Sequence, residues 1–195
     1  MLKEIRNSLE EARTGLDSLL ADTEAQKRIA AAGERLVTCL QSGGRIFSCG
    51  NGGSMCDATH FAEELTGRYR RNRRGLAALA INDPSHITCV GNDFGYDEIF
   101  ARYLESHGSN GDVLLALSTS GNSPNVIKAV TAAHHLGMTA IGLTGKADSQ
   151  LARQADITIC TPAGNYADRV QELHIKVLHI LIELVERALC PENYA

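Results

Sequence analysis

The sequence contains no tryptophan, and aromatic residues make up only 5% of its 195 positions. An aromatic platform for stacking single-stranded nucleic acid is therefore not expected. There is also no surplus of positive charge, because 19 Lys and Arg face 23 Asp and Glu and the formal net charge is -4. This balance gives no indication of a general affinity for nucleic acid or acidic membranes. We expect neither as a partner.

Long apolar runs are missing as well. No stretch approaches the roughly 18 apolar residues that span a bilayer. The first residues, MLKE, lack the charged-then-apolar pattern of a signal peptide. The expected location is the cytoplasm.

The cysteines form no recognisable framework. None of the six is paired with another at a C-x-x-C spacing. In a cytoplasmic chain we expect reduced, mostly buried thiols, in preference to disulfides or a catalytic thiol at Cys49 or Cys56.

What is present is an alternation of short apolar runs with segments of helical character. Residues 1–43 predict a helical pair that ends at Gly43-Gly44, with Asp22 or Thr23 as a cap between the two helices. Most segments between the later apolar runs are long enough for crossover helices, which predicts an α/β protein with a mostly parallel sheet covered on both faces. The predicted strands are 45–49, 76–81, 112–117, 139–143 and 157–160. The simplest organisation is one domain over 1–195, with the helical pair 1–43 ahead of a core at 44–195.

A last long helix is expected at about 166–189. Its apolar residues fall on two stripes that begin at Val170 and Ile175 and cover much of its circumference. A helix of this kind must be buried, and a chain of this length has little room to surround it. We therefore expect a second subunit to cover part of it, in a homo-oligomer.

A basic cluster, RYRRNRR, occupies residues 68–74. Such a cluster is most often a solvated loop after a helix. It could also contribute to binding an anionic substrate or to a subunit contact, and the sequence does not decide between these interpretations.

Two loops at predicted strand ends have the composition of a phosphate site. GNGGS at 50–54 follows the first strand and STSGNS at 118–123 follows the third, and each precedes a helix. Ligands bind at the carboxyl ends of parallel strands, where helix N-termini and hydroxyl groups favour phosphate. The nucleotide P-loop and dinucleotide patterns are absent. Two such loops favour a small phosphorylated ligand over ordinary turns and caps.

Ionisable and amide side chains lie in two predicted helices. His60 and Glu64 share a helix face because they are four residues apart. Polar residues also occur among the apolar residues of the C-terminal helix, namely Asp168, Gln171, His174 and His179. Buried groups of this kind need partners, so they form either satisfied core hydrogen bonds, an acid/base pair or a metal site. Spacing alone does not favour Gln171 as a ligand, because it lies roughly 12 Å from His179 along the helix.

Five longer motifs run through the chain. They are CGNGGS at 49–54, HFAEELTGRY at 60–69, VGNDFG at 90–95, STSGNS at 118–123 and YADRVQELHIKVLHI at 166–180. Together they resemble the phosphoheptose isomerases, or sedoheptulose 7-phosphate isomerases, of the sugar isomerase (SIS) superfamily. The resemblance implies a three-layer α/β/α sandwich with a five-stranded parallel sheet, assembled as a homotetramer with active sites between subunits.

The implied reaction interconverts sedoheptulose 7-phosphate and D-glycero-D-manno-heptose 7-phosphate, the first step toward nucleotide-activated heptose for lipopolysaccharide core or related glycans. By this resemblance Glu64 and His179 are the acid/base pair, and the ligands of one zinc ion per subunit are His60, Glu64, Gln171 and His179. The residues that the resemblance places against substrate are Asn51, Gly52, Gly53, Ser54, Glu64, Asn92, Asp93, Ser118, Thr119, Ser120, Ser123, Asp168 and Gln171.

Aldose–ketose isomerisation moves a proton between C1 and C2 through a cis-enediol, which requires a placed base and a stabilised oxygen. We expect Glu64 to move the carbon-bound proton, His179 to move protons at the oxygens and zinc to polarise the carbonyl. Two other functions stay open: a non-catalytic SIS-domain protein that binds a replication initiator or senses a sugar phosphate, and an isomerase for a shorter sugar phosphate. Retention of Glu63, Glu64 and His179 favours an enzyme, whereas the motifs do not report the length of the sugar.

Overall fold

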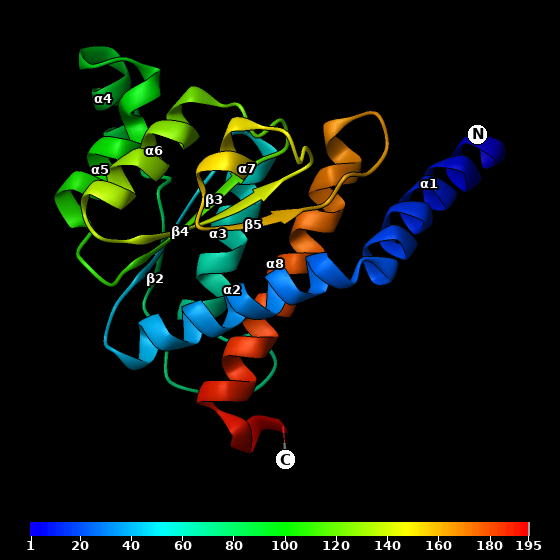
Figure 1. Ribbon diagram of the computed structural model, residues 1–195, viewed down its shortest axis with the longest axis horizontal. Helices are drawn as coiled ribbons and strands as arrows, with labels where there is room; N and C mark the ends of the chain where they lie inside the picture. The colour runs from blue at the N-terminus through cyan, green and yellow to red at the C-terminus, as the bar shows by residue number, and fades with distance from the viewer. Residues whose placement is uncertain (195) are drawn as a thin grey trace.

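In the computed structural model, which describes residues 1–194, a five-stranded parallel sheet lies between two layers of helices (Figure 1). The order across the sheet is β2-β1-β3-β4-β5. The strands are β1 (Ile46–Cys49), β2 (Ala78–Ala80), β3 (Val113–Ser118), β4 (Thr139–Thr144) and β5 (Ile157–Cys160). The predicted α/β/α sandwich is confirmed.

Side chains of each central strand alternate between two separate hydrophobic clusters, one on each face of the sheet. In β3, Val113 and Leu115 pack in one cluster, whereas Leu114 and Ala116 pack in the other. Both faces are covered, which is why the strands appear in the sequence as unbroken apolar runs. The first face carries α2 (Thr23–Gln41), α3 (Gly53–Thr66) and α8 (Ala167–Leu189), and the second carries α4 (Pro84–Asp93), α5 (Ile99–His107), α6 (Pro124–His135) and α7 (Gln150–Gln154). Two short 3-10 helices, η1 (Tyr96–Glu98) and η2 (Pro191–Tyr194), complete the elements.

The observed strands differ from the predicted ones mainly at their ends. β2 has three residues where six were predicted, because it is an edge strand whose pairing with β1 runs only from Ala78 to Ala80. β3 and β4 each continue one residue further than expected, since Ser118 and Thr144 still pair with each other. Ser118 is therefore both the last residue of β3 and the first residue of the hydroxyl-rich loop.

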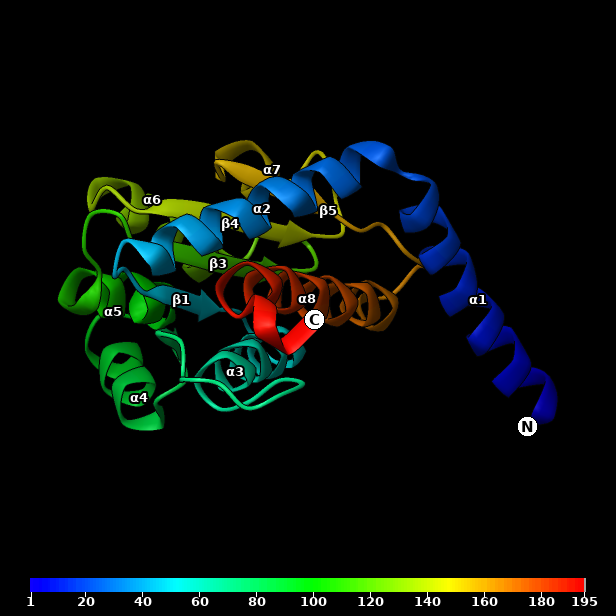
Figure 2. The same ribbon diagram turned by 90° about the horizontal axis from the view of Figure 1, so that it is seen from below.

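The first helix, α1 (Leu2–Ala21), extends away from the rest of the molecule, and α2 then returns along the first face of the sheet (Figures 1 and 2). Asp22 ends α1 and caps α2 by accepting a 2.9 Å hydrogen bond from the Ala25 N–H. No helix within residues 1–194 is both long and apolar enough to cross a membrane.

Most of the apolar residues of α8 are buried by the chain itself. Val177, Leu178 and Leu181 are fully buried beneath the sheet, α2 and α3. Ile175, Ile180 and Leu184 of α8 are only partly buried, so the expectation that a second subunit covers part of this helix stays a prediction. Further unburied apolar surface lies on α1, where Leu2 and Leu9 are exposed.

All six cysteines are free thiols, as predicted. Cys39, Cys49 and Cys190 are buried, but Cys56 and Cys89 are exposed. Burial raises the pKa of Cys49 to about 12, so this thiol is protonated and unsuited to nucleophilic chemistry near neutral pH.

Candidate active site

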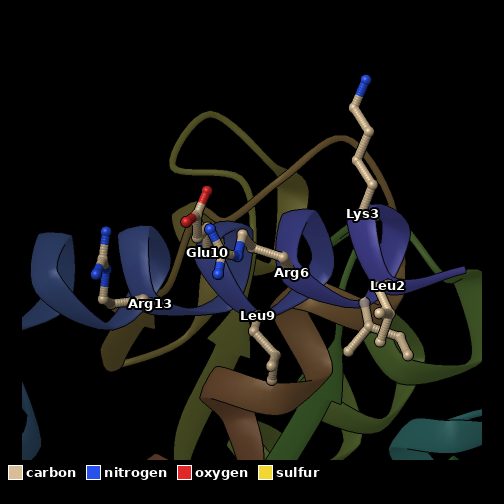
Figure 3. Close-up of a pocket in the computed structure, with 7 residues that line it drawn as sticks. Leu2, Lys3, Arg6, Leu9, Glu10 and Arg13 are labelled. Atoms are coloured by element: carbon tan, nitrogen blue, oxygen red, sulfur yellow. The ribbon is translucent and has the colours of Figure 1, made fainter.

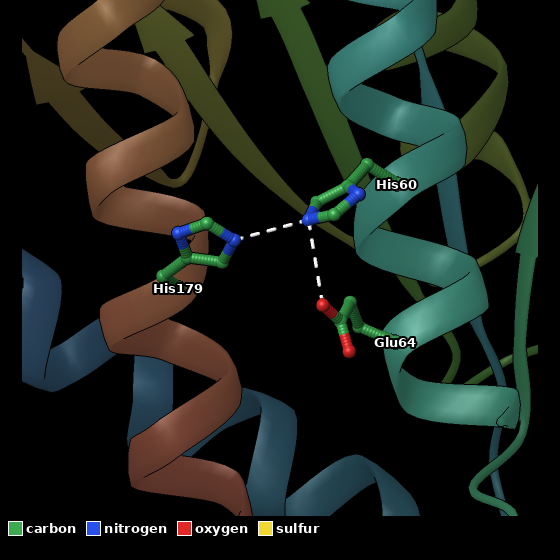
Figure 4. A group of neighbouring side chains, drawn as sticks. All are labelled: His60, Glu64 and His179. Carbon is green, nitrogen blue, oxygen red and sulfur yellow. Dashed lines mark hydrogen bonds and ion pairs between the residues drawn. The ribbon is translucent and has the colours of Figure 1, made fainter. Parts of the chain in front are cut away.

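Helices α3 and α8 bring three ionisable side chains into one group. His60 and Glu64 project from successive turns of α3 toward His179 on α8 (Figure 4). His60 Nε2 lies 3.0 Å from His179 Nε2 and 3.5 Å from Glu64 Oε1. One nitrogen or oxygen of each residue lies within 4.8 Å of the others. The structure thus brings together residues that the sequence separates by more than a hundred positions.

Burial and neighbouring charges shift the pKa values of Glu64 and His179. Burial raises the pKa of the Glu64 carboxyl, and the neighbouring Glu63 carboxylate acts in the same direction. Burial also lowers the pKa of His179, as does the nearby His60 ring. Glu64 is consequently a stronger base than a free carboxylate, and His179 is held in its neutral form, which has one donor and one acceptor nitrogen.

Gln171 belongs to α8, about two helical turns before His179. Its side chain packs against the first turn of α3. A Cβ atom at Gly53 would lie 2.6 Å from Gln171 Nε2 and 2.7 Å from its Oε1. Gly53 is therefore required so that the carboxamide can pack against the first turn of α3. This places Gln171 beside the GNGGS loop, as a substrate-binding role would require. Its role as a metal ligand stays a prediction.

The loop after β3 gathers hydroxyl groups at the start of α6. Ser118 Oγ lies 3.0 Å from Ser123 Oγ and 3.4 Å from Ser120 Oγ. The Gly121 N–H donates to Ser118 Oγ at 3.1 Å, and the loop is attached to the end of β4 by a hydrogen bond from the Gly145 N–H to the Thr119 carbonyl. These hydroxyls lie at a helix N-terminus, where unpaired N–H groups and the helix dipole favour an anion.

The loop after β1 is hydrogen-bonded to the first turn of α6, which directly follows the second loop predicted to bind phosphate. Asn51 Nδ2 donates to Asn125 Oδ1 at 2.9 Å, and Asn125 Nδ2 donates back to Asn51 Oδ1 at 2.8 Å. Tyr96 OH also donates to Asn51 Oδ1, at 3.0 Å. The adjacency of β1 and β3 makes this possible, because parallel neighbours end at the same edge of the sheet.

Comparison with known proteins identifies the family. The SIS domain family matches residues 10–145. A phosphoheptose isomerase from Aeromonas hydrophila is 58% identical over 183 residues, which cover 94% of this chain and 95% of that protein. The chain belongs to the phosphoheptose isomerase family. Within this family, a solved structure from Francisella tularensis aligns with a TM-score of 0.88 at 34% identity over 95% of this chain and 98% of the other. A Neisseria gonorrhoeae phosphoheptose isomerase aligns with a TM-score of 0.84 at 37% identity over 95% and 99% of the two chains.

The family assignment makes this chain an isomerase and confirms the predicted resemblance. It does not favour the alternative of a non-catalytic SIS-domain protein. Glu64 and His179, two of the three residues on which that distinction was based, face one shared space between α3 and α8.

Not every predicted site residue of this phosphoheptose isomerase lies in that space. Asn92 and Asp93 are exposed at the end of α4, where Asn92 Nδ2 donates to Asp93 Oδ1 at 2.7 Å. Asp168 is exposed in the first turn of α8 and accepts from the Arg169 N–H. Of the remaining predicted residues, Gly52 precedes α3 with a φ of +55° and Ser54 is buried in its first turn.

The sequence interpretation missed three residues that contribute to the site. Asn125 and Tyr96 position Asn51, and Arg73 from the basic cluster is buried against Glu186 of α8. Asn125 directly follows Pro124 in the loop-to-helix junction, a position at which its side chain could have been suspected. Nothing in the sequence distinguishes Arg73 from the other arginines around it.

Proposed function

We propose that the protein is a cytoplasmic enzyme that converts sedoheptulose 7-phosphate to D-glycero-D-manno-heptose 7-phosphate, as a first step toward activated heptose for surface glycans. The observation that carries this proposal is the meeting of Glu64 and His179 between α3 and α8. Two loops suited to a phosphate lie at the starts of α3 and α6. Family membership supports a phosphorylated heptose as the substrate.

The phosphate end of the substrate is assigned to the loop at 118–123. Ser118, Ser120 and Ser123 offer three hydroxyl donors, with the hydroxyls of Ser120 and Ser123 within 3.4 Å of that of Ser118, and the N-terminus of α6 adds backbone N–H groups. No lysine occurs in this loop, so recognition depends on oriented dipoles and hydroxyl hydrogen bonds. The mutual hydrogen bonds between Asn51 and Asn125 fix the start of α6, which follows this loop, relative to the loop after β1.

Proton transfer is assigned to Glu64 and His179. The carboxylate of Glu64 removes the proton from the carbon next to the carbonyl, because its raised pKa strengthens it as a base. Neutral His179 exchanges protons with the substrate oxygens, donating from one ring nitrogen and accepting at the other. The same pair acting in reverse delivers the proton to the adjacent carbon and completes the conversion of ketose to aldose.

The donor set between the helices fits zinc. Two imidazole nitrogens and one carboxylate oxygen converge within 4.8 Å, and zinc catalytic sites use such sets of histidine and carboxylate ligands. We assign His60, His179 and Glu64 as the residues that would hold the ion, with Gln171 as the predicted fourth ligand. A bound zinc would polarise the substrate carbonyl as a Lewis acid. Ligation weakens a carboxylate as a base, so Glu64 cannot serve fully as ligand and base at the same moment.

A homotetramer is proposed on the basis of α1. Leu2, Leu9 and Leu20 are 84%, 67% and 73% exposed on a helix that projects from the body of the molecule. Leu2 and Leu9 lie on the same side of α1, whereas Lys3 points away from it (Figure 3). Burying such a row against other subunits removes apolar surface from water. The exposed positions of Asn92 and Asp93 suit residues that complete a site across a subunit boundary.

The experiment that tests the function is NMR of the purified enzyme with sedoheptulose 7-phosphate. The proposal predicts the appearance of the aldose heptose 7-phosphate and little turnover of pentose or hexose phosphates offered in parallel. Preferential turnover of a shorter sugar phosphate would show that this shorter sugar, and not the heptose, is the substrate. No isomerisation of any sugar phosphate, together with capture of a replication initiator, would favour a non-catalytic role.

A further inference from the structure

The basic cluster at 68–74 contains one arginine that is not at the surface. Arg73 Nε donates to Glu186 Oε1 of α8 at 2.6 Å, and the two side chains are 2% and 0% exposed. A buried ion pair of this kind loses the hydration of both charges, and its net contribution to stability is often small. The contacts that such a pair holds in place then matter more than the stability it adds.

The other donors of Arg73 bind the end of α3. Nη2 donates to the Glu64 carbonyl at 2.7 Å, and Nη1 donates to the Leu65 carbonyl at 2.8 Å. These carbonyls belong to the last turn of α3, where no partner within the helix is available, and a cation there is favoured by the helix dipole. One planar guanidinium thus joins the backbone of the candidate base to α8.

On α8, the contacts of the segment 69–73 follow one face of the helix. The Tyr69 ring stacks on the His179 ring with 6.0 Å between centroids, Arg70 pairs with Glu183 at 2.8 Å, and Arg73 pairs with Glu186. Positions 179, 183 and 186 are separated by four and three residues and so share that face. The second Glu186 oxygen accepts from Tyr194 OH at 3.0 Å.

We propose that Arg73 is a positioning residue for the isomerisation, which sets the distance between Glu64 on α3 and His179 on α8. The inference rests on the proposed function of these two residues. The Arg73 side chain is almost fully buried, so it acts through the backbone of Glu64 and through Glu186. Lysine cannot replace it, because a single ammonium group cannot span a carboxylate and two carbonyls with the geometry of the guanidinium fork.

The test compares wild type with Arg73→Lys, which keeps the charge, and with the double variant Arg73→Met/Glu186→Met, which removes both charges together and so avoids leaving one unpaired in the core. Misplacement of the base by about 1 Å can reduce the rate about a hundredfold. We expect kcat to fall at least about tenfold in both variants, with KM changed less than about threefold. The deuterium isotope effect for substrate labelled at the transferred hydrogen should increase, because proton transfer becomes slower relative to the other steps.

A merely structural role would give a different result, since partial unfolding lowers the active fraction and leaves KM and the isotope effect unchanged. Arg45→Lys is the control, because the Arg45 guanidinium bonds Asp112 and Ser109, which lie outside α3 and α8; its kinetics should equal those of wild type. A crystal structure of Arg73→Lys should show Glu64 and His179 displaced relative to each other.

Unchanged kcat and isotope effect in folded Arg73→Lys and in the double variant would overturn the inference while the proposed function stands. Wild type without isomerase activity would instead contradict the proposed function. The displacement of Glu64 relative to His179 in the variant crystal structure would then decide the inference by itself, with an unchanged separation overturning it.

Discussion

The Nε2 atoms of His60 and His179 lie 3.0 Å apart, although 119 residues separate them in the chain. Two imidazole nitrogens at this distance require a proton or a cation between them, because two unshared lone pairs repel each other. The Glu64 carboxylate lies 3.5 Å from the same His60 nitrogen. Helices α3 and α8 therefore form one compact group that suits the proposed proton transfer and cation binding.

The base assignment predicts a severe effect of Glu64→Gln. The amide keeps the size of the side chain but cannot accept the carbon-bound proton, and loss of a general base costs about 10²- to 10⁴-fold in kcat. Steady-state kinetics, with circular dichroism to verify folding, make the comparison. Glu105→Gln on the exposed surface of α5 is the control and should match wild type. Turnover of Glu64→Gln close to that of the control would rule out Glu64 as the base.

The metal assignment predicts one zinc ion per chain in calorimetric titration of metal-free enzyme with Zn²⁺. His60→Ala should weaken that affinity by at least about tenfold, since one of the ligands is lost. His134→Ala is the matched control, because His134 pairs with Asp156 outside the group, and it should bind zinc like wild type. Equal zinc binding by both variants, or full activity of chelated enzyme shown to be metal-free, would contradict a catalytic zinc held here.

If the apolar face of α1 forms the subunit interface, a single charge introduced on that face should disrupt the tetramer. We expect wild type to sediment as a tetramer at micromolar concentration and Leu9→Glu to sediment as a smaller species, because a buried carboxylate without a partner is costly. Lys3→Glu, which places the same charge on the other side of α1, should leave the tetramer intact. A wild-type monomer at this concentration, or an unchanged Leu9→Glu assembly, would refute the proposed interface.

A buried histidine predicts acid sensitivity of the fold. His174 on α8 is fully buried, and burial lowers its pKa from 6.5 to about 4. As the pH falls from 6.5 to 4, the unfolded chain takes up a proton that the folded chain does not, so stability is lost over this range. The loss attributable to His174 approaches about 3 kcal/mol.

Urea unfolding of wild type and His174→Leu at pH 7 and at pH 4 measures that contribution. The free energy of unfolding of wild type should decrease more than that of the variant, by about the amount given above. The exposed His135→Leu should behave like wild type. Parallel decreases in wild type and His174→Leu would show that His174 is not the acid-sensitive group.

The sequence was sufficient for the parts of the fold that depend on local pattern. All five strands were located because each is a short apolar run that the sheet buries on both sides. Asp22 was recognised as a cap from its position between two helical segments, and the structure shows its hydrogen bond. The edge strand β2 was predicted too long, because apolar residues alone do not reveal how far a partner strand extends.

Contacts between distant segments could not be predicted in the same way. Nothing in the sequence separates the arginines of 68–74 from one another. In the structure, however, the Arg73 side chain is buried, whereas Arg70 forms a partly exposed ion pair. What distinguishes them is the path of the chain after α3, which places Arg73 beside a residue 113 positions later. The same limit applies to Asn125, whose partner Asn51 is 74 residues away.

The central claim is that Glu64 transfers the hydrogen as a proton. NMR of the conversion of sedoheptulose 7-phosphate in D₂O tests it most directly. The account predicts that wild type forms an aldose that carries solvent deuterium at C2, and that Glu64→Gln forms neither product nor deuterated ketose at a comparable rate. Product that retains all of its original hydrogen, formed equally well by wild type and Glu64→Gln, would contradict it.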